Sequence, residues 1–193
     1  MTGYVRLVDT MGTDLTVVNT ARVSFDKESS ALSLADEKLI EYIVKHGHNS
    51  CLRHCVMTFE IYAPMMVKNQ WIKHMVASAH VEDQNGWNES SRRYVTENEV
   101  FYVPEHFLAA PANKKQGAGE PVDEWTNDIY RLALTRFQEQ GVKLYKQAIA
   151  DGIAPEEARL FLPAYGLYIR WRWTASLNAI LNFLDQRLDK HAQ

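Results

Sequence analysis

Residues 70–94 read QWIKHMVASAHVEDQNGWNESSRRY and gather cationic, acidic, amide and hydroxyl side chains into one short segment. Two tryptophans, Trp71 and Trp87, lie among these polar residues. Such a segment is either a solvated loop or the lining of a site for a flat anion. Arginine, which occurs twice in this segment, binds planar anions through a forked pair of donors. The rest of the sequence is needed to choose between a solvated loop and an anion site.

Two strands are predicted from hydrophobic periodicity. The first is the short run Tyr4–Val8. The second is residues 56–62, VMTFEIY, in which apolar and polar residues alternate with the period of a half-buried strand. Thr58 and Glu60 fall on the polar side of this pattern.

Helices are predicted on both sides of the second strand. Residues 33–47 begin with a capping serine, carry an apolar stripe and end in glycine. Pro64 opens another helix, because proline is tolerated in a first turn. Gln70, Lys73 and His74 then share one helix face at i, i+3 and i+4. The quoted stretch therefore begins on a helix and ends in a loop.

The second half of the chain is predicted to hold a loop and a long helix. Residues 103–121 contain prolines and glycines typical of a long loop, such as a lid or an interface arm. A helix running toward Gly152 follows. Its apolar positions are Trp125, Ile129, Leu132 and Phe137.

The last predicted helix covers residues 174–190 and has two kinds of face. Its expected core face is formed by Leu177, Ile180, Leu181 and Leu184. Asn178, Asn182 and Asp185 form a polar stripe beside that face. Because this polar stripe lies beside a core stripe, we expect a wet pocket here. The asparagines either join helices or present amides to a heterocycle.

Composition limits the class of protein. The chain has 193 residues, 46% of them hydrophobic, with 21 basic and 24 acidic residues and a net charge of -3. These values favour one domain and argue against bulk electrostatic attachment to nucleic acid or membrane. No apolar run is long enough for a membrane helix, and Met1–Asp9 lacks the pattern of a signal peptide. With two cysteines only, we expect a cytoplasmic protein.

One cluster has the residue types of a zinc site: His46, His48, Cys51, His54 and Cys55. No second Cys/His pair at ligand spacing occurs elsewhere in the chain. Cys51 and Cys55 are therefore better interpreted as small core residues at the start of a strand, and no metal is predicted.

Arginines supply the candidate anion site. Arg92 and Arg93 directly follow the polar triplet 89–91. Arg159 and Arg187 each lie in a helix-like segment with mostly apolar neighbours. Arginines at the edge of a core favour a carboxylate or a phosphate as partner.

These residues resemble the flavin-dependent thymidylate synthase family. That family has Arg-His-Arg, then Ser after seven residues, inside a run that ends Asn-Glu-any-Ser-any-Arg-Tyr. The residues that match this ending are Asn88, Glu89, Ser91, Arg93 and Tyr94. Lys73, His74 and Met75 stand where the family has Arg-His-Arg, and an insertion separates Ser78 from Asn88.

Further segments resemble the family in the same order along the chain. They are ARVSF at 21–25, HGHNSCLRH at 46–54, Gln70 ahead of Lys73, EARLFLP at 157–163 and LNFLDQRLDKHAQ at 181–193. The resemblance implies a single α+β catalytic domain over residues 1–193, with helices packed on a small, mainly antiparallel sheet. It also implies a homotetramer with active sites at subunit interfaces.

The implied reaction is the methylation of dUMP to dTMP. Methylenetetrahydrofolate supplies the carbon, and FADH2, regenerated by NADPH, supplies the reducing equivalents. The residues implied as catalytic are Arg187 and Ser91. Those implied in binding dUMP are Gln70, Lys73, Glu89, Ser90, Ser91, Arg92, Arg93, Arg159 and Arg187. Those implied in binding FAD are Ser24, His54, Val56, Lys73, His74, Met75, Glu89, Ser176, Asn178 and Asn182.

The substitutions at Lys73 and Met75 leave alternatives open. A lysine keeps the charge but loses the fork that binds phosphate bidentately. The chain could therefore be a dUMP-modifying relative, such as a hydroxymethylase, or a non-catalytic nucleotide- or RNA-binding homologue. Our main interpretation is the synthase, with dUMP, folate and NADPH as ligands and neither membrane nor nucleic acid as partner.

Overall fold

The computed structural model describes residues 3–74, 86–91, 98–111 and 117–188. Four strands form one antiparallel sheet in the order β1-β2-β4-β3. They are β1 (Tyr4–Met11), β2 (Val56–Pro64), β3 (Gly86–Glu89) and β4 (Tyr168–Ser176). With the helices packed on this sheet, the structure confirms the predicted α+β class.

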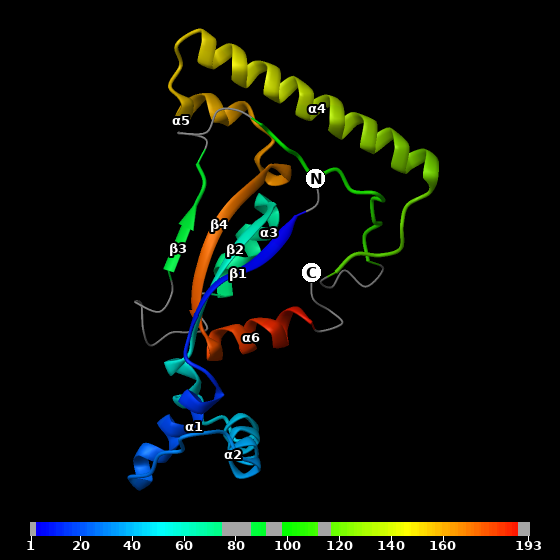
Figure 1. Cartoon of the computed structure of the whole chain (residues 1–193). Coiled ribbons are helices and arrows are strands. Elements are labelled where there is room, and N and C mark those ends of the chain that lie inside the picture. The colour runs from blue at the N-terminus through cyan, green and yellow to red at the C-terminus, as the bar shows by residue number, and fades with distance from the viewer. Residues whose placement is uncertain (1–2, 75–85, 92–97, 112–116, 189–193) are drawn as a thin grey trace.

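Figure 1 shows how the α-helices are arranged around the sheet. They are α1 (Asp14–Arg22), α2 (Leu34–Lys45), α3 (Met65–Trp71), α4 (Glu124–Ala150), α5 (Pro155–Ala158) and α6 (Leu177–Arg187). Short 3-10 turns include η1 (Val23–Phe25), η2 (Cys51–His54), η5 (Arg159–Phe161) and η6 (Ala164–Gly166). α4 crosses one end of the sheet, and α1 and α2 lie beyond the opposite end.

Helix α2 begins and ends where the sequence predicts. The Ser33 hydroxyl accepts a hydrogen bond from the Asp36 amide (3.4 Å), and the Asp36 carboxylate accepts one from the Ser33 amide (3.0 Å). This reciprocal capping satisfies two amides at the helix start. Gly47, at a φ of 66°, then turns the chain away in a left-handed conformation that suits glycine.

The main core lies between one face of the sheet and three helices. Ile61, Trp171 and Trp173 come from β2 and β4 and are almost fully buried. Residues of α3, α4 and α6 pack against them. The core therefore holds α3 and α6 firmly against the same sheet face.

Strand β4 was not predicted. Its residues alternate between buried Ile169, Trp171, Trp173 and Ala175 and more exposed neighbours, which is the period of a strand. The last helix accordingly begins at Leu177 and not at Thr174. The Ser176 hydroxyl caps it by accepting a hydrogen bond from the Ala179 amide (3.3 Å).

The expected core face of α6 is also wrong in part. Ala179, Ile180 and Phe183 face the core, while Leu181 and Leu184 are exposed. Four leucine and isoleucine positions could not fix the rotation of the helix, because Phe183 competes for the same core. The helix turns toward the larger ring, and this rotation places Arg187 on the inner side.

Glu60 is buried, although the alternation in β2 placed it on the polar side of a half-buried strand. Its carboxylate accepts hydrogen bonds from Tyr4 Oη (3.1 Å), Arg6 Nη2 (2.9 Å) and Arg172 Nε (3.4 Å). Burial alone would raise the pKa of Glu60, but these partners together lower it. A central strand flanked by arginines can thus hold a buried carboxylate at a position that the alternation pattern predicts to face solvent.

Helix α4 is present as predicted, but the apolar residues that indicated it are exposed. Trp125, Ile129, Leu132 and Phe137 all face away from the core. The C-terminal half of α4 is the part that packs on the core, where Tyr145 and Ala148 are buried. Gly141 lies so close to η5 that an added Cβ would come within 2.7 Å of a backbone oxygen. At 27 residues α4 is about 40 Å long, yet none of the described helices is long and apolar enough to cross a membrane.

Candidate active site

Arg187, in the last turn of α6, forms the centre of a small polar cluster. Its Nε donates to His74 Nε2 (2.8 Å), and its Nη1 donates to Gln70 Oε1 (3.4 Å). Gln70 lies on α3 and His74 in the 3-10 turn that continues it. The predicted common face of Gln70 and His74 is therefore confirmed, whereas Lys73 between them is exposed.

The protonation state of His74 follows from this contact. His74 is 8% exposed. Its Nε2 accepts the hydrogen bond from Arg187, so the neutral imidazole carries its own hydrogen on Nδ1. Burial, and then the charge of Arg187, lower the pKa of His74. Phe183 meets the imidazole edge-on at 5.0 Å between ring centroids, and Trp71 stacks on Phe183 at 4.4 Å. The arginine is thus held by a neutral acceptor in a packed setting.

A second cluster brings together two residues predicted to bind phosphate. Arg159 Nη1 donates to Ser91 Oγ (3.3 Å), and Arg159 Nε donates to the Glu156 carbonyl (3.1 Å). Arg159 is otherwise exposed. The adjacent Ser90 is used differently, since its hydroxyl accepts from the Arg170 amide (3.0 Å) and its own amide donates to the Arg170 carbonyl (2.7 Å). Ser90 therefore anchors the segment that carries Ser91.

Glu89 is fixed by two partners that sequence reasoning missed. Trp87 Nε1 donates to Glu89 Oε2 (3.1 Å), and Lys68 Nζ lies 3.2 Å from the same oxygen. The Lys68 side chain is 13% exposed and the Glu89 side chain 39%, so this ion pair is only partly shielded from water. Because Lys68 and Glu89 lie 21 residues apart on a helix and a strand, no local pattern could have joined them.

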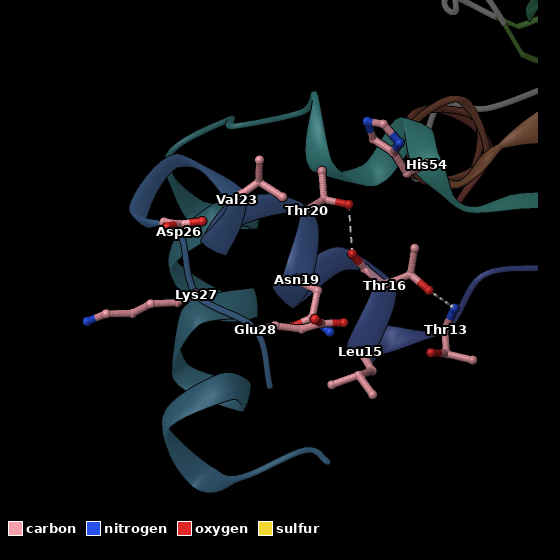
Figure 2. Close-up of a pocket in the computed structure, with 10 residues that line it drawn as sticks. All are labelled: Thr13, Leu15, Thr16, Asn19, Thr20, Val23, Asp26, Lys27, Glu28 and His54. Atoms are coloured by element: carbon pink, nitrogen blue, oxygen red, sulfur yellow. Dashed lines mark hydrogen bonds between the residues drawn. The ribbon is translucent and has the colours of Figure 1, made fainter. Parts of the chain in front are cut away.

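His54 lines an open pocket of about 910 Å³ beside α1. Figure 2 shows the residues that line it, among them His54, Thr16 and Thr20, together with Asn19 and Glu28. Thr16 and Thr20 are held in place, because Thr20 Oγ1 donates to the Thr16 carbonyl at 2.8 Å. The predicted flavin residue Ser24 is exposed on η1, next to this pocket.

A second open pocket, of about 550 Å³, contains the asparagine stripe of α6. Its lining includes Asn49, Asn178, Leu181, Asn182 and Asp185. An open pocket therefore lies beside the polar stripe where the sequence predicts one. Amide donors and acceptors next to leucine side chains suit a flat heterocycle with polar edges, such as a flavin ring.

Val56 and Ser176 lie at the sheet end near these pockets. They are paired across β2 and β4. Val56 is half-buried, and Ser176 is fully buried with its hydroxyl used as the cap of α6. The structure thus gives Ser176 a role in helix formation, and its predicted contact with flavin stays a prediction.

Comparison with known proteins was made against this geometry. The family described as Thymidylate synthase complementing protein matches residues 6–193. A flavin-dependent thymidylate synthase from Thermosipho africanus is 36% identical over 191 residues, which is 99% of this chain and 79% of that enzyme. The chain belongs to the flavin-dependent thymidylate synthase family. It is thereby placed in a family of enzymes, as the motif predicted.

Other members of the flavin-dependent thymidylate synthase family and solved structures agree. The Thermus thermophilus enzyme is 37% identical over 193 residues, 99% of this chain and 66% of that enzyme. The UMP/dUMP methylase PolB from Streptomyces cacaoi, solved with 5-Br dUMP, superimposes with a TM-score of 0.78 at 30% identity. That superposition covers 96% of this chain and 78% of the PolB chain. The fold predicted from the family motif is therefore confirmed.

Three predicted site residues, Met75, Arg92 and Arg93, lie outside the described residues. The same holds for most of the insertion that interrupts the family motif, residues 79–85. Their predicted roles toward dUMP and FAD stay predictions.

The residues of the alternative zinc site have other contacts. Cys51 and Cys55 are buried in a core cluster with Val17 and Ile43. Burial, and then the charge of Asp14, raise the pKa of the Cys55 thiol. The rings of His46 and His48 pack on Tyr42, at 4.0 Å and 5.5 Å between centroids. Within the described part of the chain, no three His, Cys, Asp or Glu side chains gather to hold a metal.

Proposed function

We propose that this protein methylates dUMP to dTMP, with methylenetetrahydrofolate as carbon donor and an NADPH-reduced FAD as reductant. Family membership supports the reaction class. The PolB structures, solved with brominated UMP and dUMP, support a uridine nucleotide as substrate. The observation that carries the proposal is the guanidinium of Arg187, held at 2.8 Å by a neutral His74 and also bonded to Gln70.

Arg187 suits the chemical problem of this reaction. C5 of uracil is a weak nucleophile, and attack by C5 develops negative charge on the ring carbonyls. A guanidinium fixed before the reaction stabilises that charge without reorganising in the transition state. His74 takes the Nε hydrogen and Gln70 accepts from Nη1, so these two contacts fix the plane of the guanidinium that would face the base. No thiolate is invoked, because Cys51 and Cys55 are both buried.

Arg159 and Ser91 would bind the 5′-phosphate. Their side chains already lie 3.3 Å apart, so a phosphate could contact the guanidinium and the hydroxyl together. Charge-assisted hydrogen bonds of this type each contribute about 1.5–3 kcal/mol when shielded, and less at an exposed site such as Arg159. Glu89, fixed by Lys68 and Trp87, would orient the base or the sugar together with Gln70.

The flavin end of the proposal involves His54, Asn178 and Asn182. Their pockets combine amides, an imidazole and leucines, which fits the residue types a flavin ring requires. Bound reduced flavin supplies the hydride that turns a methylene group into methyl. The protein's own contribution is to hold the ring edges and to keep water from the reacting carbon.

A homotetramer with shared sites, built from single catalytic domains spanning residues 1–193, is part of the same proposal. The exposed apolar residues of α4, among them Trp125 and Phe137, support burial against another subunit. The open pockets at His54 and Asn182 are consistent with walls completed by a second copy. A cytoplasmic location remains the prediction made from the two unpaired cysteines.

The decisive experiment is product analysis with dUMP, methylenetetrahydrofolate, NADPH and FAD. We expect dTMP, a yellow protein, and bleaching of the flavin by NADPH. A parallel reaction with UMP tests the wider substrate range named for PolB. A hydroxymethylated product would replace our proposal by the hydroxymethylase, and a colourless protein that binds dUMP without turnover would replace it by the non-catalytic homologue.

A further inference from the structure

The two faces of the sheet differ in what covers them. The face with Ile61, Trp171 and Trp173 packs on the core. The opposite face has no such cluster among the described residues, and its side chains form rows across the strands. One row, read from the strand register, consists of Arg6, Glu60, Arg172 and Asn88. The row beside it consists of Tyr4, Tyr62 and Arg170. We call this surface the open face.

The open face carries a surplus of positive charge. Glu60 is buried, and it accepts hydrogen bonds from Arg6 and Arg172. The side chains of these two arginines remain 62% and 57% exposed. Arg170 is exposed as well and acts on Glu60 through its charge. Three guanidinium groups around one carboxylate leave most of their N–H donors directed at solvent, in a chain whose net charge is -3.

Aromatic rings lie next to these arginines. Tyr4 stacks on Tyr62 with ring centroids 5.7 Å apart, and Tyr62 lies 5.1 Å from Tyr168. Tyr4, at the edge strand, keeps 40% of its surface exposed. Its hydroxyl donates to Glu60 at 3.1 Å, which fixes the ring beside Arg6. These rings add a surface for stacking beside the guanidinium groups, which solvated salt bridges alone would not provide.

The surface is also hollowed at this point. Tyr4, Arg6, Glu60 and Arg170 line a cavity of about 490 Å³, which is within the range of about 300–1,000 Å³ for small-molecule sites. Aromatic rings for stacking and guanidinium groups for phosphate are the means by which proteins bind nucleotides without reading their sequence. Because the chain as a whole is negatively charged, it does not attract polyanions over long distances, and such a site would bind one or a few phosphates through direct contacts.

We propose that the open face is a second nucleotide-binding site. Arg6, Arg170 and Arg172 bind the phosphates, and Tyr4 presents its ring to the base. The nucleotide is either free or a unit of a single strand, because the chemistry is the same. This site is separate from Arg187 and His74, which lie with α3 and α6 on the covered side of the sheet. The inference does not rest on the proposed function.

The test uses the full chain, with and without dUMP, because dUMP is expected at the site around Arg187 and is itself a nucleotide that would compete at the open face. Binding of a short fluorescein-labelled oligothymidylate is followed by anisotropy at several salt concentrations, with unlabelled dTTP, ATP and inorganic tripolyphosphate as competitors. Arg170→Gln removes a charge without unpairing Glu60. The double variant Arg6→Gln/Glu60→Gln removes an arginine together with the carboxylate that needs it. Arg136→Gln, on the exposed side of α4, is the matched control.

We expect Arg170→Gln to weaken binding about 10-fold, and each lost phosphate contact to lower the slope of log affinity against log salt by about 1. Tyr4→Leu should weaken the nucleotides but not tripolyphosphate. Competition by mononucleotides identifies a small-molecule site, and binding of the oligonucleotide alone identifies a single-strand site.

Three results would overturn the inference. One is equal binding by Arg170→Gln and the Arg136→Gln control. Another is tripolyphosphate competing as well as dTTP in both wild type and Tyr4→Leu, which would leave only a nonspecific anion surface. The third is a change of oligomeric state in Arg170→Gln, measured by light scattering, which would reassign the open face to an interface between copies.

Discussion

The two ends of the proposed active site are built differently. At the nucleotide end, Arg187 contacts both His74 and Gln70 within a packed setting. At the flavin end, His54 and Asn182 line two separate, open pockets. One end is therefore already organised within a single chain, while the other offers surfaces that a ligand or a second subunit must bring together. Substitutions at Arg187 and its partners should change rates, and substitutions at the flavin end should change binding.

The largest effect is expected from Arg187→Lys. Lysine keeps the charge but loses the planar pair of donors and the Nε contact to His74. Removing a donor of this kind typically costs about 100-fold or more in turnover. dTMP formation, flavin content and flavin reduction by NADPH are measured on the same preparation, with Arg131→Lys on α4 as control. Near-normal dTMP formation would break the comparison, because Arg187 would then be a structural residue.

A smaller effect is expected from Arg159→Gln. The guanidinium contacts Ser91 at 3.3 Å but is exposed, so its phosphate contact should contribute about 1.4 kcal/mol, or a 10-fold change. We expect the KM for dUMP to rise by about that factor while kcat changes little. Arg136→Gln serves as the control of equal charge. An unchanged KM would show that the 5′-phosphate of dUMP does not bind at Arg159 and Ser91.

Asn182→Leu tests the flavin end. Losing one neutral hydrogen bond costs about 1 kcal/mol, so we expect flavin to dissociate about 5-fold more readily, with turnover near normal when FAD is in excess. Gln140→Leu, exposed on α4, is the matched variant. The contrast between the two ends would be lost if Asn182→Leu slowed a fully flavin-loaded enzyme.

The smallest effect concerns pH and His74. The pKa of His74 lies below its ordinary value of 6.5 because of burial and Arg187, so the unfolded chain takes up the proton first as the pH falls. Its contribution to stability is therefore complete above about pH 6.5 and is lost below it. Protonation would also remove the acceptor for Arg187. We expect turnover to fall a few-fold as the pH is lowered below about 6.5 and His74 takes up a proton.

His74→Gln provides the comparison for that measurement, since a glutamine oxygen can accept from Arg187 but does not titrate. Its profiles of Tm and turnover should be flatter over the same pH range. The charged side chains described near His74 are Arg187 on α6 and Lys73 on its own turn. A profile that falls equally in both proteins would assign the effect to another group.

The sequence predicted elements with strong local signals and missed those defined by distant pairing. The Ser33 cap and the glycine at 47 marked α2 correctly. β4 was missed although YIRWRWTAS alternates, because its last residues were assigned to the following helix. Glu60 was placed by alternation alone, since nothing in VMTFEIY reveals that Arg6 and Arg172 lie on either side of it.

The candidate site shows the same division. Family resemblance supplied Gln70, His74 and Arg187, and the structure places them in contact. It also placed Ser90 among the substrate ligands; the structure adds that the Ser90 hydroxyl accepts from the backbone of β4, and its contact with dUMP stays a prediction. Lys68 was missed because its partner Glu89 is on another element. A motif identifies which residues matter, but their hydrogen-bond partners depend on strand pairing.

The strand order β1-β2-β4-β3 has a consequence for how the chain is made. β4 lies between β2 and β3 but is synthesised after both, and within the described residues β3 pairs with no other strand. Roughly a hundred residues separate β2 from β4, so a ribosome adding about 5–20 residues per second leaves the edge of β2 open for about 5–20 s. During that interval the hydrophobic face of β2 is exposed to other nascent chains. Demand for a chaperone should therefore peak just before residues 168–176 emerge.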